Sequence, residues 1–131
     1  MKYLGIDFGA KRVGVAVSDY AGAIAFPRVV LRNDDTVLAH LLDLITKEGI
    51  EKIVIGDTLS HGGAENPVTA EAEKFAERLK AETHLPVVSM WEMWSSIEAS
   101  RYDPAKSSHY DAAAAAIILQ RYLDIHANTV Q

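Results

Sequence analysis

Residues 2–19 read "KYLGIDFGAKRVGVAVSD", and this stretch decides the fold. Apolar side chains at alternate positions from Leu4 to Phe8 are typical of a strand with one face in the core. A second alternating run covers residues 12–18, and the short link between the two runs predicts a β-hairpin. Asp7 stands within the first run, where an unpaired buried carboxylate is costly. The stretch therefore predicts that Asp7 has a proton, a partner or a cation.

Working outward, the pattern predicts a third strand over residues 24–31, and Pro27 favours the edge of a sheet for it. Helices and strands then alternate. The expected order is a helix at 33–50 ending at Gly49, a buried strand at 52–57, a helix at 66–84, a buried strand at 85–92, a short helix at 93–102 and a long helix at 109–127. A hairpin and third strand followed by this alternation predict an α/β fold with a mixed sheet and helices on both faces.

The totals exclude several classes of protein. The chain has 131 residues, a net charge of −5 and no cysteine. We expect one domain over residues 1–131, without disulfides, a thiol nucleophile or cysteine metal ligands. The longest apolar run, 112–119, is far shorter than the ~20 residues that span a bilayer. With no signal-peptide pattern at the N-terminus, a cytoplasmic protein without membrane contact is expected. The negative charge argues against coating nucleic acid by electrostatics alone.

Three acidic residues are the candidates for chemistry. Asp7 lies in the first strand, Glu92 ends the last predicted strand, and Asp111 opens the final helix on its apolar face. Each also has a structural interpretation: Asp7 paired with backbone donors or an arginine, and the other two as favourable charges at helix starts. Taken together they come from separate elements that this topology can bring to one edge. Three oxygen ligands suit Mg²⁺ or Mn²⁺.

The chain resembles the YqgF family, within the RNase H-like superfamily, from Lys2 to about His126. The segments that carry the resemblance are "LGIDFGAKRVGVAVSD", "IVIG" with "AEAEKFAERL" after it, "LPVVSMWEMWSSIEAS" and "YDAAAAAIILQRYL". The resemblance implies a five-stranded sheet in the order 3-2-1-4-5 with strand 2 antiparallel. It also implies that Asp7, Glu92 and Asp111 are the catalytic, metal-binding acids.

The implied activity is metal-dependent cleavage of a nucleic-acid backbone with Mg²⁺ or Mn²⁺. Family members have two assigned roles, the maturation of the 16S rRNA precursor and the resolution of four-way DNA junctions, and we expect the first. The family pattern has a basic residue at the position of Lys11, and we expect Lys11, Arg12 and Lys106 to contact nucleic acid. Pre-ribosomal particles are the expected partners of a monomer or homodimer.

The sequence departs from the family pattern around two of the acids. Glu92 lies in "WEMWSS", where the family has Asp-Glu-Arg before a Thr pair, and the segment before Asp111, "DPAKSSHYD", is short and carries one lysine. Both changes reduce positive charge and predict a weaker grip on substrate. Two alternatives stay open: a catalytically weak adaptor that keeps the fold, and a nucleotide-binding domain of the actin-like type, whose first phosphate-binding segment resembles "DFGAKRVGVAVSD".

Overall fold

The computed structural model describes residues 1–56, 67–90 and 110–129. Its strands form one five-stranded sheet in the order β3-β2-β1-β4-β5. β2 pairs antiparallel with β1 and β3, whereas β4 is parallel to β1 and β5. The elements are β1 (Tyr3–Phe8), β2 (Arg12–Ser18), β3 (Ala25–Arg32), α1 (Val37–Glu48), β4 (Lys52–Gly56), α2 (Pro67–Thr83), β5 (Val87–Ser89) and α4 (Tyr110–Thr129). The predicted strand order and the antiparallel second strand are confirmed.

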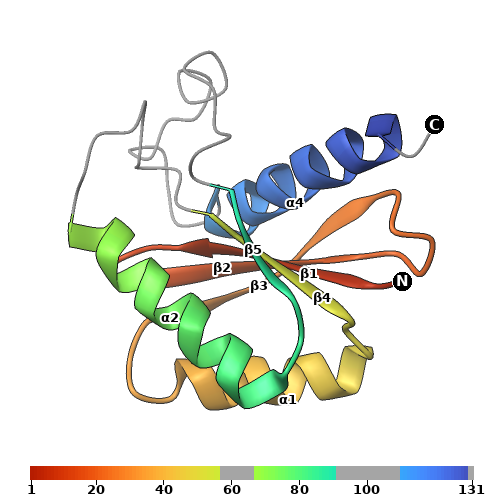
Figure 1. Cartoon of the computed structure of the whole chain (residues 1–131). Helices are drawn as coiled ribbons and strands as arrows, with labels where there is room; N and C mark the ends of the chain where they lie inside the picture. The colour runs from red at the N-terminus through yellow and green to blue at the C-terminus, as the bar shows by residue number, and fades with distance from the viewer. Residues whose placement is uncertain (57–66, 91–109, 130–131) are drawn as a thin grey trace.

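The sheet separates two layers of helix (Figure 1): α4 covers one face, and α1 and α2 cover the other. The alternation in the first hairpin explains this division, because successive side chains of a strand point to opposite faces. Leu4, Ile6 and Phe8 join the core beneath α1 and α2. The small residues between them face α4, whose own core contribution includes Ala115, Ile118 and Leu119. The prediction of helices on both faces is confirmed.

Several glycine and proline residues have the structural roles that the sequence predicts. Gly49 ends α1 in the left-handed conformation, with φ 66°, which glycine adopts without the penalty of a Cβ. Pro67 is the first residue of α2, where its missing N–H costs nothing. β3, which contains Pro27, lies at one edge of the sheet. Among the described residues, none of the helices combines the length and the apolar character needed to cross a membrane.

One strand differs from the prediction. The segment 85–92 was expected to form a strand buried on both faces, but β5 covers only Val87–Ser89, and its residues are half-buried or exposed. The reason is its place at the outer edge of the sheet, beside β4 alone. A continuous apolar run is shared by central and edge strands, so the run itself does not reveal this position. β4 has the predicted burial throughout Ile53–Gly56.

A small ion-pair network joins the end of α1 to the sheet. Lys2 Nζ donates to Glu48 Oε1 at 2.7 Å, and Arg28 Nε donates to Glu48 Oε2 at 3.1 Å. The Glu48 side chain is 21% exposed. The hydrogen bond from Lys2, followed by that from Arg28, lowers the pKa of the Glu48 carboxyl. The ionised carboxylate therefore stabilises the folded chain.

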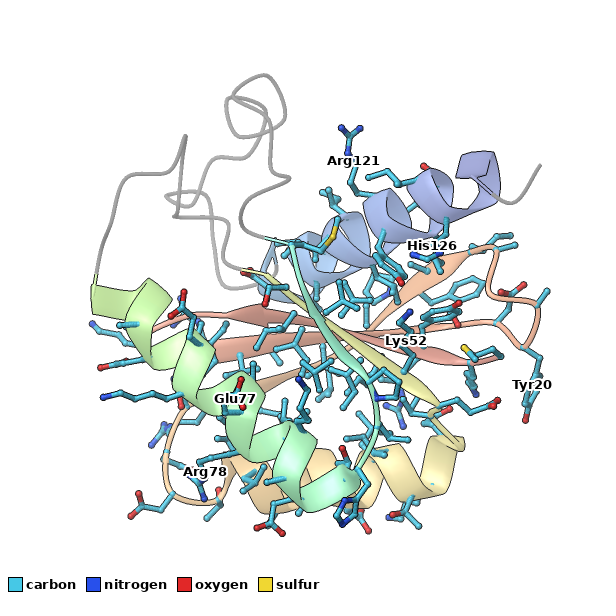
Figure 2. All side chains as sticks on the ribbon, in the orientation of Figure 1. Tyr20, Lys52, Glu77, Arg78, Arg121 and His126 are labelled. Carbon is cyan, nitrogen blue, oxygen red and sulfur yellow. The ribbon has the colours of Figure 1, made fainter. Side chains whose placement is uncertain are left out.

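We expect Glu48→Gln to lower the free energy of unfolding at pH 7 by about 1 kcal/mol, since it removes two ion pairs at the surface. Because the pKa is lowered on folding, this contribution is complete above the ordinary glutamate value of about 4.3 and is lost as pH falls through the lowered value. Urea unfolding from pH 7 down to pH 3 should show the deficit shrinking. The exposed Glu77 on α2 (Figure 2) supplies the control Glu77→Gln. A deficit that does not change with pH would contradict the role of this network.

Candidate functional site

Asp7 is a buried acid near the C-terminal end of β1. It is 7% exposed, and within the described residues only it and Ser18 are polar and buried. In the sheet, Asp7 lies between Gly14 of β2 and Gly56 of β4. Neither neighbour carries a side chain, so another element can approach the sheet closely on both sides of the carboxylate. β1 and β4 are parallel and end together here, as strands do at ligand sites in open α/β sheets.

The face of the sheet that carries Asp7 is packed very closely by α4. A Cβ built on Gly5 would lie 2.7 Å from Leu119 Cβ and 3.0 Å from the Ala115 carbonyl oxygen, and one on Gly56 would lie 3.1 Å from Ile118. Directly opposed residues of neighbouring strands share a face, so Gly5, Asp7 and Gly56 all face this helix. Glycine on the sheet and alanine on the helix are what allow the close approach.

The direction of α4 can be followed from three contacts along β1. The Tyr3 ring lies 5.9 Å from the Tyr122 ring, and Gly5 meets Leu119 and Ala115. Residue numbers that increase along β1 therefore meet residue numbers that decrease along α4. Asp7 is one strand repeat beyond Gly5, about 7 Å, and residue 111 is one helical turn before Ala115, about 5–6 Å. The backbone of α4 therefore runs its first turn, which contains Asp111, toward the Asp7 end of β1.

The structure describes the other two predicted acids only in part. Asp111 belongs to the first turn of α4, but its side chain lies outside the described residues, and Glu92 lies outside them altogether. Within the described part of the chain, no three His, Cys, Asp or Glu side chains form a group able to hold a metal ion. The structure thus places Asp7 and the backbone at 111, and the convergence of the three carboxylates stays a prediction.

The predicted nucleic-acid contacts lie at the same end of the hairpin. Lys11 is exposed in the link between β1 and β2, and Arg12 is the exposed first residue of β2. Both line an open groove of about 540 Å³ that also includes Arg32 and Asn33. Lys106 lies outside the described residues.

Sequence reasoning missed Arg32 and Asn33. Arg32 ends β3 and is the cross-strand partner of Arg12. The pairing depends on the register of β2 and β3, and this register shifts at Val15/Ala16. The available signal was a basic residue at the end of a strand that follows a hairpin, which is too common to single out.

Comparisons with known proteins agree with this geometry. Residues 1–125 match the family model described as "RuvX: Holliday junction resolvase". A protein of Nitratidesulfovibrio vulgaris, provisionally named as a pre-16S rRNA nuclease, is 42% identical over 95% of this chain and 94% of its own length. A protein of Maridesulfovibrio salexigens with the same provisional name is 38% identical over 94% of this chain and 98% of its own length.

Among solved structures, Thermus thermophilus RuvC in complex with a Holliday junction substrate matches with a TM-score of 0.63. The alignment covers 98% of this chain and 97% of that chain at 16% identity, so the likeness concerns the fold. The fowlpox virus Holliday junction resolvase matches with a TM-score of 0.52 at 10% identity. Both neighbours share the arrangement of sheet and helices described above.

Proposed function

The chain belongs to the RuvX family of nucleases, described as Holliday junction resolvases, and from this premise we propose that it cleaves phosphodiester bonds of the 16S rRNA precursor at its 5′ end in the cytoplasm. The relatives that match over almost their whole length carry the provisional name of pre-16S rRNA nucleases. In this proposal one domain acts, as a monomer or a homodimer, on RNA presented by a pre-ribosomal particle.

The observation that carries the proposal is the position of Asp7. This carboxylate is 7% exposed and lies in the middle of the sheet, between two glycines, where a buried charge requires a partner or a cation. Its place at the end of two parallel strands suits a ligand more than it suits the core. The first turn of α4, with Asp111, approaches from above the same face.

The chemistry of these residues fits a divalent cation. Carboxylate oxygens are the ligands that Mg²⁺ and Mn²⁺ prefer. In the proposal Asp7, Glu92 and Asp111 hold the ion. When bound, the cation would supply positive charge at the phosphate under attack and lower the pKa of a coordinated water. No described side chain is required as a covalent nucleophile.

The second candidate is the resolution of four-way DNA junctions. The description of the family favours it. Both candidates use the same acids and the same cation, so they differ in the shape of the nucleic acid that reaches Asp7. An experiment that compares substrates, and not one that examines the catalytic groups, therefore distinguishes the two candidates.

Removing the metal should abolish cleavage. We expect the full chain to cut a single-stranded RNA that spans the 5′ end of mature 16S rRNA in Mn²⁺ or Mg²⁺, and EDTA to stop the reaction because the carboxylates alone supply no positive charge to the phosphate. Excess Mn²⁺ added after EDTA should restore the rate. End-labelled RNA, DNA of the same sequence and a four-way DNA junction, resolved on gels, give the measurement.

Each outcome assigns a function. Cleavage of the junction without cleavage of RNA would replace the proposal by the second candidate. Binding of RNA without cleavage in either metal would support the adaptor. Tight ATP binding without cleavage of any nucleic acid would support the actin-like alternative. Cleavage that persists in EDTA would overturn the metal-dependent mechanism.

A further inference from the structure

The open groove beyond Asp7 gathers positive charge in an acidic protein. Lys11, Arg12 and Arg32 line it, although the whole chain has a net charge of −5. Its volume of about 540 Å³ lies between the β1–β2 link and the end of β3. Lys11, Arg12 and Arg32 are all exposed. Three cations without an acid among the described lining residues suit an anionic ligand.

Two of these cations are placed directly opposite each other. Arg12 and Arg32 are partners in the antiparallel β2–β3 ladder, and like charges in such a pair repel. Asp34 follows this strand end, and its Oδ1 accepts hydrogen bonds from Thr36 N at 2.9 Å and Thr36 Oγ1 at 2.6 Å. These hydrogen bonds, and to a smaller extent the charge of Arg32, lower the pKa of the Asp34 carboxyl.

The hydrogen bonds of Asn33 fix the shape of the groove. Its Nδ2 donates to the Gly9 carbonyl oxygen at 2.7 Å, and its backbone N–H donates to the Lys11 carbonyl oxygen at 2.9 Å. Gly9 N–H in turn donates to the Arg12 carbonyl oxygen at 3.0 Å. The link that carries Lys11 is therefore tied to the end of β3, and the backbone from which the cations extend is fixed before any ligand arrives.

Asp7, Arg12 and Arg32 share one face and one end of the sheet. Asp7 is opposite Gly14, and Arg12 lies two residues before Gly14 on the same strand, about 7 Å away on the same face. Arg32 is one strand further, about 5 Å to the side. A chain of phosphates leaving Asp7 toward the β3 edge would reach the two guanidinium groups at this end of the sheet.

We propose that this groove binds the sugar–phosphate backbone of the substrate strand beside the bond that is cut, with Arg32 and Arg12 as its main phosphate ligands. The inference rests on the proposed function and adds to it the direction in which the strand leaves Asp7, toward the β3 edge. Guanidinium groups suit the task because their planar donors engage two phosphate oxygens at once. The contact reads no base, so RNA and DNA strands bind by the same chemistry.

The test compares Arg32→Gln and Arg12→Gln with Lys80→Gln, which removes the same charge from the exposed last turn of α2 on the other face of the sheet. Affinity for labelled single-stranded RNA and DNA is measured in EDTA over a range of salt. Each arginine variant should bind the RNA and the DNA about tenfold more weakly at low salt. Each should also reduce the magnitude of the slope of log K against log salt by about 1. Lys80→Gln should change neither.

Steady-state cleavage gives a second readout, since a lost backbone contact raises KM for the cleaved substrate and leaves kcat nearly unchanged. If both arginine variants have the salt slope and the affinity of wild type, the proposed binding of the strand in this groove is wrong, even if cleavage is metal-dependent. Weakened binding in a chain that cuts nothing would retain the groove and reject the nuclease. Weaker ATP binding with unchanged strand affinity would assign the groove to a nucleotide and overturn the inference.

Discussion

Asp7→Asn is expected to lower metal-dependent cleavage by at least about a hundredfold. Even the outer partners of metal ligands cost about 10–100-fold when they are removed, so loss of a direct ligand should cost no less. The asparagine side chain has nearly the same shape and lies among the same glycines, so the fold should be kept. Cleavage rates at saturating Mn²⁺, with circular dichroism of the same samples, give the measurement.

The matched control is Asp43→Asn on α1. Its carboxylate is exposed and pairs with Lys47 at 3.0 Å, on the face of the sheet opposite α4. A ligand that binds only the folded state also stabilises it, by about 2.7 kcal/mol at one hundred times its Kd. Mn²⁺ should therefore raise the melting temperature of wild type and Asp43→Asn, and leave that of Asp7→Asn unchanged. An Asp7→Asn protein that cuts at the normal rate would remove Asp7 from the site.

Gly5→Val is expected to be the most destabilising substitution near the site, by about 3 kcal/mol or more. The first carbon of any side chain at this position would lie 2.7 Å from Leu119 Cβ and 3.0 Å from the Ala115 carbonyl oxygen. The second of these atoms is helix backbone and yields only if α4 moves as a whole. Valine adds two further methyl groups to the same contact, so the helix must rise from the sheet.

Gly49→Ala provides the comparison for Gly5→Val. Nothing lies within 4 Å of a Cβ built on Gly49, and its φ of 66° imposes backbone strain alone. We expect that variant to lose about 1–2 kcal/mol. Urea unfolding measures both changes. Since a raised α4 also moves Asp111, Gly5→Ala should lose activity at temperatures where it is still folded. Equal stabilities for Gly5→Val and Gly49→Ala would show that the close packing of α4 is not required.

The sequence predicted the sheet because apolar residues alternate strictly in the segments that form β1 and β2. Two alternating runs joined by a short link leave few alternatives to a hairpin, and the apolar run of β4 indicates a further strand. β5 was mispredicted because a three-residue strand at an edge has the same composition as a buried one. For the site, Asp7 could be recognised from an acid out of place in an apolar strand.

Arg32 could not be recognised in this way, because its significance comes from lying opposite Arg12. That pairing is a property of two strands in register, including the shift at Val15/Ala16, and no local pattern at Arg32 expresses it. A residue such as Asp7, which stands out by its apolar neighbours in the sequence, can be singled out from the sequence. A residue such as Arg32, which stands out by its cross-strand partner, can be singled out only once the register of the sheet is known.

The glycines beneath α4 have a consequence for protein engineering. Replacing glycine by alanine is a common way to raise thermal resistance, since it restricts the unfolded chain. At Gly5 the same exchange would meet the last helix instead, so its usual benefit reverses. The glycines on which the last helix packs also lie beside the buried Asp7. A library of stabilising substitutions should therefore leave these glycines unchanged and vary α1, α2 and the outer surface.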